Sequence, residues 1–225
     1  MEELNDYILK VTNLGVKAQN EIILENVSFK IKGGTTLAIV GPNGAGKSTL
    51  FRALLNLVPY TGKIEWEGKV RIGYVPQIVA VKDVPISVKE FLSYRDGVNI
   101  EQALSAVRLE DSEIVSKTLG VLSGGELRRI LIAWAIIDNP NVLLFDEPTT
   151  GVDTGSEESI FVMLNDLKEK KKITMLLITH DVHLVKEYTN QLLALNKCIT
   201  FFGDSKQMAE PSLQQKIYGE TICLH

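Results

Sequence analysis

A glycine-rich segment lies between a largely apolar run and a candidate helix near the start of the chain. The run covers residues 36–40 and ends directly at Gly41-Pro42-Asn43-Gly44-Ala45-Gly46-Lys47-Ser48-Thr49. This segment fits the pattern G-x-x-x-x-G-K-[ST], whose glycines let backbone N–H groups close around phosphates. Lys47 is expected to supply charge to the terminal phosphates, and the Ser48 hydroxyl is a candidate Mg²⁺ ligand. Strand, loop and helix together predict a nucleotide-binding α/β core.

A second run of small residues, Leu122-Ser123-Gly124-Gly125-Glu126, precedes another candidate helix. The free N–H groups and positive dipole end of a helix start favour a bound anion. The chain therefore carries two separate candidate places to hold a phosphate.

Two acids and a histidine follow apolar runs later in the chain. Residues 142–145 lead directly to Asp146 and Glu147, and residues 173–179 lead to His180. Burying adjacent carboxylates without a use is costly, so Asp146 is predicted to reach a magnesium ion. Glu147 is predicted to polarise the water that attacks the terminal phosphate. In a parallel sheet His180 lies at the same edge and is expected to sense that phosphate.

Composition narrows the class of protein. The 225 residues carry a net charge of -4, without the broad basic field that duplex nucleic acid demands, so no nucleic-acid partner is expected. The longest apolar run, at 130–137, is far shorter than the ~20 residues of a membrane helix. We expect no secretion signal, because the N-terminus is acidic and lacks a basic segment before an apolar one. Cys198 and Cys223 fit no metal-ligand spacing and are expected to be thiols in a reducing cytosol.

Hydrophobic periodicity predicts strands that alternate with helices. The predicted strands cover residues 22–31, 36–40, 63–67, 70–75, 142–145, 173–179, 191–195 and 198–202. The predicted helices cover residues 47–57, 127–137, 156–170 and 181–188, with a further helical stretch over 85–116. This order implies a largely parallel sheet covered on both faces. We expect one α/β domain, with residues 1–76 and 127–225 as a core with an antiparallel β subdomain and residues 77–126 as a helical insert.

The motifs and their order resemble the ATP-binding subunits of ABC transporters across essentially the whole chain. The phosphate loop is followed by Gln77 after a strand, then by Leu-Ser-Gly-Gly, Asp-Glu-Pro, Gly-Val-Asp and His180-Asp181. The resemblance implies a head-to-tail homodimer that forms on ATP binding. In that dimer Ser123, Gly124 and Gly125 of one subunit complete the ATP site held by Lys47 of the other.

The same resemblance implies a role for each remaining motif residue. It makes Gln77 the lever that contacts Mg²⁺ and the membrane partner, and Glu147 the catalytic base. It makes Asp153 the communicator across the dimer and His180 the γ-phosphate switch. Glu126 stands where many family members have glutamine, a change that we expect to cost little.

Four stretches resemble the zinc, manganese and iron(II) importers of the metal-chelate class most closely. They are residues 69–77, 149–153, 180–185 and 195–199. This resemblance implies an ATPase that energises an integral membrane permease importing zinc or manganese. It also implies an extracytoplasmic metal-binding protein as indirect partner, and a cytoplasmic location at the inner face of the membrane.

The chain departs from the family where adenine is held, and other functions stay open. The family's adenine-stacking aromatic falls near Ala18, yet residues 8–28 contain no aromatic residue, which predicts weak adenine discrimination. The histidine-rich tail common in the zinc branch is also absent. The alternatives are an ABC ATPase for another substrate, or one that serves cofactor assembly without transport. A P-loop GTPase is disfavoured because Asn196-Lys197 is not followed by x-Asp.

Overall fold

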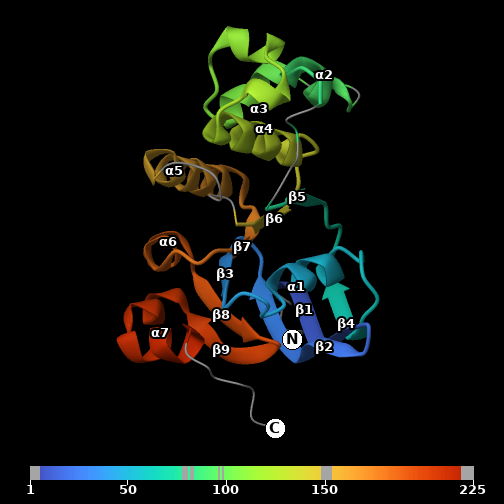
Figure 1. Cartoon of the computed structure of the whole chain (residues 1–225), viewed down its shortest axis with the longest axis vertical. Coiled ribbons are helices and arrows are strands. Elements are labelled where there is room, and N and C mark those ends of the chain that lie inside the picture. Colours follow the sequence, from blue (N-terminus) through green and yellow to red (C-terminus); the bar gives the residue numbers. More distant parts are fainter. Residues whose placement is uncertain are drawn as a thin grey trace.

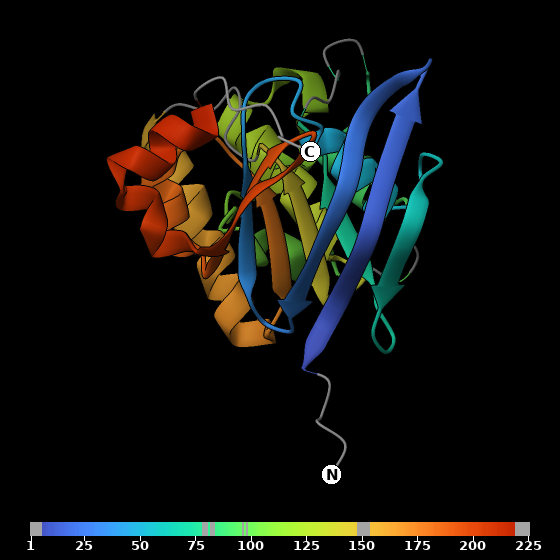
Figure 2. The same cartoon turned by 90° about the horizontal axis from the view of Figure 1, so that it is seen from below.

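Two β-sheets with helices packed around them make up the protein (Figures 1 and 2). The computed structural model describes residues 6–77, 81, 84–95, 97, 99–147 and 154–218. Within these residues, no helix is long and apolar enough to cross a membrane.

The larger sheet carries the strands expected to form the core. Its six strands lie in the order β5 (Ile72–Val75), β6 (Val142–Asp146), β7 (Thr174–Ile178), β3 (Thr36–Val40), β8 (Gln191–Asn196) and β9 (Cys198–Asp204). Every neighbouring pair is parallel except β8 and β9, which form an antiparallel hairpin. The predicted α/β fold with a mostly parallel sheet is confirmed. Parallel neighbours bring their carboxyl ends to one edge of the sheet, where the candidate residues lie.

The smaller sheet is antiparallel, as expected, but one of its strands was missed. Its order is β2 (Glu21–Lys32), β1 (Tyr7–Ala18) and β4 (Thr61–Trp66). Periodicity alone did not predict β1, because the strand is irregular at Asn13, whose φ is 50°. The buried positions therefore change from Leu9 and Val11 to Leu14 and Val16 across this irregularity, which breaks the strict alternation expected of a strand.

The first helix is shorter than predicted. The helix α1 is Lys47–Leu54 rather than 47–57, so the predicted end was wrong by three residues. Asn56 takes a left-handed conformation with a φ of 56°, which a continuing helix cannot contain. Leu57 is 66% exposed and adds nothing to the apolar face of the helix.

Helices cover the larger sheet on one face, and α1 with the smaller sheet covers the other. The first group is α2 (Val88–Ser93), α3 (Ile100–Ala106), α4 (Gly124–Ile136), α5 (Thr154–Lys171), α6 (Val182–Tyr188) and α7 (Pro211–Tyr218), with short 3₁₀ turns at 112–116, 119–121 and 205–209. Figure 1 shows α2, α3 and α4 together beyond the β5 and β6 edge, far from α1. The helix α7 was not predicted.

The side chains of β6 point alternately into the two hydrophobic cores on either side of the larger sheet. Leu143 and Phe145 belong to the core beneath the helices, while Val142 and Leu144 belong to the core shared with α1 and the smaller sheet. All four side chains are fully buried, so the strand is apolar on both faces until Asp146. A strand buried on both faces reads as a continuous apolar run, which explains why its end was predicted well.

Cys198, the first residue of β9, is disulfide-bonded. The expectation of a thiol at this position is therefore wrong, while Cys223 lies outside the described residues. Whether a cysteine can form a disulfide depends on a Cα separation of about 4.4–6.8 Å from another cysteine. Only tertiary structure sets that separation, so residue count and spacing could not give it.

Candidate functional site

The phosphate loop between β3 and α1 needs glycine at two of its positions for steric reasons. A Cβ atom on Gly41 would lie 2.0 Å from the Leu195 carbonyl oxygen. Gly46 has a φ of 92°, and a Cβ atom there would lie 2.5 Å from Leu24 Cδ2 and 2.9 Å from the Ile23 oxygen. The loop is thus pressed against β2 and β8, which holds its backbone in place.

Lys47 closes the loop on itself. Its Nζ donates hydrogen bonds of 2.8 Å to the Gly41 oxygen and 2.9 Å to the Pro42 oxygen. Burial lowers the pKa of the ammonium, and the negative charges of Glu147 and Asp146 act against this shift. No side chain caps the start of α1, and its first turn contains no acid. Lysine charge and helix dipole therefore act on the same small volume, which suits an anion.

Ser48 and Asp146 meet beneath the loop. Ser48 Oγ donates to Asp146 Oδ1 at 3.3 Å, although the two residues come from α1 and from the end of β6. Asp146 is only 4% exposed. Burial raises the pKa of this carboxyl, as does the charge of Glu147, while the Ser48 hydrogen bond and Lys47 lower it. A hydroxyl and a buried carboxylate are the hard oxygen ligands that Mg²⁺ prefers, so the pair fits a magnesium site.

Gln77 and Glu147 are joined directly at the ends of neighbouring strands. Gln77 Nε2 donates to Glu147 Oε2 at 2.6 Å. Glu147 has a φ of 50°, a left-handed conformation that is uncommon outside glycine, and its N–H donates to the Ile178 oxygen at 3.0 Å. Strained backbone of this kind concentrates at functional sites. Here the strain lies at Glu147 itself, directly after β6.

His180 lies at the same edge of the sheet as these residues. It follows β7 by two residues, and β7 is in register with β6 so that Ile178 faces Asp146. The His180 side chain is exposed. The structure therefore gathers the phosphate loop, Gln77, Asp146, Glu147 and His180 at the carboxyl ends of β3, β5, β6 and β7. This placement agrees with the sequence-based expectation.

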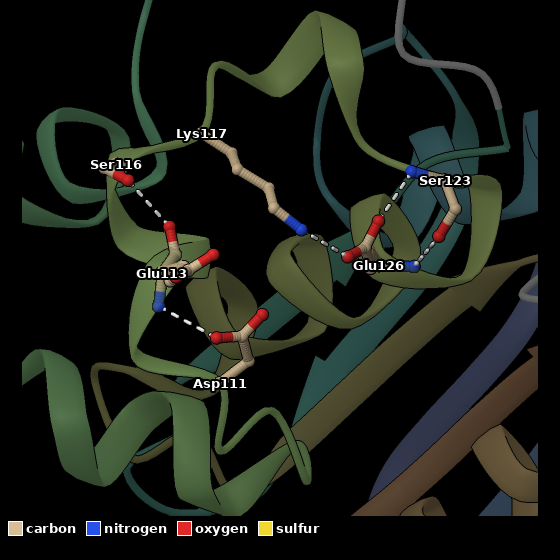
Figure 3. A network of polar contacts seen from close by, with 6 residues as sticks. All are labelled: Asp111, Glu113, Ser116, Lys117, Ser123 and Glu126. Atoms are coloured by element: carbon tan, nitrogen blue, oxygen red, sulfur yellow. Dashed lines mark hydrogen bonds and ion pairs between the residues drawn. The ribbon is translucent and has the colours of Figure 1, made fainter.

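The second candidate phosphate-binding run forms the start of α4. Ser123 and Glu126 bond to each other reciprocally, because Glu126 N donates to Ser123 Oγ at 3.2 Å and Ser123 N donates to Glu126 Oε2 at 2.8 Å (Figure 3). These bonds lower the pKa of the Glu126 carboxyl, and Lys117, whose Nζ lies 3.2 Å from Glu126 Oε1, adds to the shift. Ser123 and Gly124 are exposed. Glu126 is thus engaged as the partner of a helix cap.

The two candidate phosphate-binding places lie in different parts of the fold. The start of α4 belongs to the helical group formed by α2, α3 and α4, whereas the phosphate loop leads into α1 beside the smaller sheet (Figure 1). Of the predicted site residues, Asp153 lies outside the described residues.

Sequence reasoning missed the position of Arg128. This residue is 5% exposed, and its guanidinium donates to the backbone oxygens of Pro76 at 2.9 Å, Gln77 at 3.1 Å and Glu147 at 3.3 Å. Burial lowers its pKa, while the charges of Asp146 and Glu147 favour its ionised form. The sequence did carry a signal for this position, because Arg128 lies on a helix face that apolar residues otherwise occupy. A charged residue is rarely buried without a partner, so such an arginine indicates a buried contact.

Comparison with known proteins places these features in a family. The sequence profile described as ABC transporter matches residues 24–150. The zinc import ATP-binding protein ZnuC of Pseudomonas putida is 33% identical over 97% of this chain and 86% of its own length. ZnuC of Pseudomonas aeruginosa is 33% identical over 96% of this chain and 82% of its own length.

Solved structures show the same likeness. An inward-facing metal-chelate type ABC transporter superimposes with a TM-score of 0.83 at 29% identity, covering 94% of this chain and 88% of the other. A nucleotide-free ATP-binding cassette from an ABC transporter gives a TM-score of 0.80 at 25% identity, over 94% of this chain and 97% of the other.

Proposed function

The chain belongs to the ABC transporter family, and on that premise we propose that it is the ATP-hydrolysing subunit of an importer of divalent metal ions, zinc or manganese. The observation that carries the hydrolytic part is a grouping at one sheet edge, where Ser48 bonds to Asp146, Gln77 bonds to Glu147, and Lys47 lies within the electrostatic influence of both acids. The metal is suggested by relatives named zinc import ATP-binding proteins, which align with nearly the whole chain.

The phosphate loop would hold the ATP phosphates through its backbone N–H groups. The residues concerned are Gly41, Pro42, Asn43, Gly44, Ala45, Gly46, Lys47, Ser48 and Thr49, with proline contributing only its fixed backbone. Lys47 would exchange its two carbonyl partners for phosphate oxygens, because a bound phosphate offers a full negative charge.

Ser48, Asp146 and Gln77 would hold Mg²⁺, whose positive charge offsets the charge of the β- and γ-phosphates. The contact between Ser48 and Asp146 supports this assignment. Burial disfavours the Asp146 carboxylate in the absence of a cation, and a nearby positive charge reverses that preference.

Glu147 would act as general base and take a proton from the attacking water. Its carboxylate accepts a hydrogen bond from Gln77, so the movement of Gln77 would decide when the carboxylate can turn to that water. His180, at the end of the neighbouring strand, would contact the terminal phosphate. A positioned base of this kind contributes about 10²–10⁴-fold to a rate.

Two copies of the chain would close head to tail around ATP. The exposed start of α4 would present Ser123, Gly124 and Gly125 to the phosphates held by Lys47 of a second copy. The head-to-tail arrangement is supported by the position of the α4 start. This start has a completed cap and lies in the helical group, away from the phosphate loop of the same chain. Asp153 would link the two sites across the dimer.

An aromatic cluster on α2 and α4, partly buried at Phe91 and Trp134 and exposed at Tyr94, is the proposed docking surface for a membrane permease. The ring centroids of Phe91 and Trp134 lie 4.7 Å apart, and those of Tyr94 and Trp134 lie 6.4 Å apart. Tyr94 is 87% exposed, and Arg95 lies 4.9 Å over the Trp134 ring. Phe91 and Tyr94 of this cluster belong to the segment that follows Gln77, the residue expected to contact the membrane partner. The chain would then work at the inner face of the membrane, with an extracytoplasmic metal-binding protein delivering the ion.

The dimer is tested with Glu147→Gln, which keeps the shape of the side chain and removes the base. With ATP and Mg²⁺ the variant should form a dimer in light scattering, because binding proceeds and hydrolysis no longer reopens it. Adding Lys47→Ala to the same variant should abolish the dimer. A Glu147→Gln variant that stays monomeric in saturating ATP would contradict the proposal.

Transport is tested by purifying the chain with its partners from native membranes. A many-spanning membrane protein should copurify, and the complex in liposomes should move zinc or manganese when ATP is supplied on the side of this subunit. Copurification of a soluble scaffold alone, without ATP-driven metal movement, would contradict the transport role.

A further inference from the structure

Arg128 connects the start of α4 to the two residues that meet at the end of the sheet. It follows Gly124 by four residues, about one helical turn. Its NH1 donates to the Pro76 oxygen at 2.9 Å, and its NH2 donates to the Gln77 oxygen at 3.1 Å and the Glu147 oxygen at 3.3 Å. One side chain thus bonds to the backbone after β5 and to the backbone after β6.

The guanidinium suits this position for two physical reasons. Its planar fork carries five N–H donors in fixed directions, so bonds to several carbonyl oxygens restrain their relative positions. Its buried charge is balanced by Asp146 and Glu147, whose negative charges favour the ionised form. A lysine would keep the charge but not the fork, and a glutamine would keep some donors but not the charge.

The side chains of Gln77 and Glu147 are already bonded at 2.6 Å. Arg128 adds a second connection between the same two residues, through their backbone oxygens. A displacement of α4 must therefore move both residues or break hydrogen bonds in a buried place, and breaking such bonds is costly.

We propose that Arg128 is a positioning residue. It makes the positions of Gln77 and Glu147 depend on whether ATP contacts the Ser123–Gly125 surface of the same chain. The inference rests on the proposed function, in which Ser123–Gly125 contacts the ATP held by a second copy. ATP at that surface shifts α4, and Arg128 moves the Gln77 and Glu147 backbones with it. Occupation of one ATP site thereby sets the geometry of the base in the other, and the two sites hydrolyse cooperatively.

Arg129 offers a matched control on the same helix. Its guanidinium donates to the Val107 oxygen at 2.8 Å and to Ser159 Oγ at 2.7 Å, so it joins the helical group to α5. It is a partly buried arginine with backbone and side-chain partners, but none of these described contacts reaches Gln77 or Glu147. Its loss should lower stability without changing the coupling between sites.

The test is steady-state ATP hydrolysis by the full chain over a range of ATP concentrations. Wild type should give a Hill coefficient above 1. Arg128→Gln should lower kcat by about 10- to 100-fold, the effect of a displaced catalytic group, and bring the Hill coefficient to 1. The KM for ATP should change less than about twofold, because the interactions of the phosphate loop are intact. Arg128→Lys should recover part of kcat and little of the Hill coefficient.

Thermal melting and binding of a fluorescent ATP analogue show which variants are folded. If Arg128→Gln does not fold, the Hill coefficient of Arg128→Lys tests the inference instead, and a value near 1 is expected. The inference is overturned if folded Arg128 variants keep wild-type cooperativity, if Arg129→Gln removes cooperativity equally, or if wild type has a Hill coefficient of 1. A wild-type chain that binds ATP but never hydrolyses it overturns the proposed function itself, and the coupling with it.

Discussion

Gln77 Nε2 lies 2.6 Å from Glu147 Oε2, so the proposed lever and the proposed base are bonded to each other across the ends of β5 and β6. Neither residue reaches this contact through sequence proximity, since they lie 70 positions apart. The contact ties the orientation of the base to a residue expected to respond both to magnesium and to the membrane partner.

Gln77→Glu should raise the pH at which hydrolysis begins. The change places a second carboxyl group against Glu147, and two carboxylates at this distance repel each other, so one of the two stays protonated to higher pH. The ascending limb of the plot of kcat/KM against pH should therefore move to higher pH. Gln77→Ala, which adds no charge, should lower activity without moving that limb. Identical pH profiles for the two variants would exclude the contact in the working enzyme.

Asp146→Asn should stabilise the chain without nucleotide while abolishing Mg²⁺-dependent hydrolysis. Burial raises the pKa of Asp146 in the folded state. The folded state therefore holds this proton at pH values where the unfolded state has lost it. Stability falls as pH rises from the usual aspartate range, near 3.9, through the raised folded pKa. Asparagine has no ionisable group, so the variant does not lose stability in this way as the pH rises.

The measurement is thermal melting in the presence of a chelator from pH 4 to pH 8. The melting temperature of Asp146→Asn should exceed that of wild type at pH 7, by about 2–4 °C for each kcal/mol gained in a chain of this size. The difference should vanish towards pH 4. A lower melting temperature for Asp146→Asn at pH 7 would show that this carboxylate stabilises the empty site instead.

Gly46→Ala should destabilise the fold more than Gly44→Ala. Both glycines have a positive φ, 92° and 79°, so each alanine costs about 1–2 kcal/mol for the left-handed backbone. A Cβ atom on Gly44 meets nothing within 4 Å, whereas one on Gly46 overlaps Leu24. Forced overlap adds about 1–3 kcal/mol. Urea unfolding of the two variants measures the difference, and equal losses would argue against the packing of the loop on β2.

Ala18→Tyr should tighten ATP binding and create a preference for adenine. Ala18 is exposed at the end of β1, where the family's stacking aromatic is expected. Stacking of a base on an aromatic ring contributes about 1–3 kcal/mol, by analogy with single-stranded nucleic acid. Wild type should distinguish ATP from GTP weakly in competition titrations. Ala18→Leu, which adds apolar surface without a π face, is the control, and a strong adenine preference in wild type would contradict the idea.

The parts of the site that follow from local rules were predictable. Lys47 and Ser48 follow a glycine pattern that needs only a strand before it and a helix after it. Asp146 and Glu147 follow a run whose continuous apolar character marks a strand buried on both faces. The carboxyl ends of parallel strands meet at one edge, so His180 could be assigned to that edge from order alone.

Elements that depend on local irregularity were harder to predict. The strand β1 escaped detection because the change of register near Asn13 interrupts its alternation. The end of α1 was placed too late because the left-handed Asn56 leaves no mark in the apolar pattern. Both failures arise where one residue adopts an uncommon, left-handed backbone conformation.

Side-chain partners were decided by tertiary structure alone. Periodicity placed Arg128 on a helix, but only the fold turns that face of α4 towards the carbonyl groups of Gln77 and Glu147. Motif order assigned these two residues to one edge, and only packing brought their side chains into contact. The disulfide at Cys198 likewise depends on tertiary structure, because it requires a second cysteine close in space. Local pattern thus defines which chemical groups the chain carries and on which elements, whereas the separations between them depend on how the layers pack.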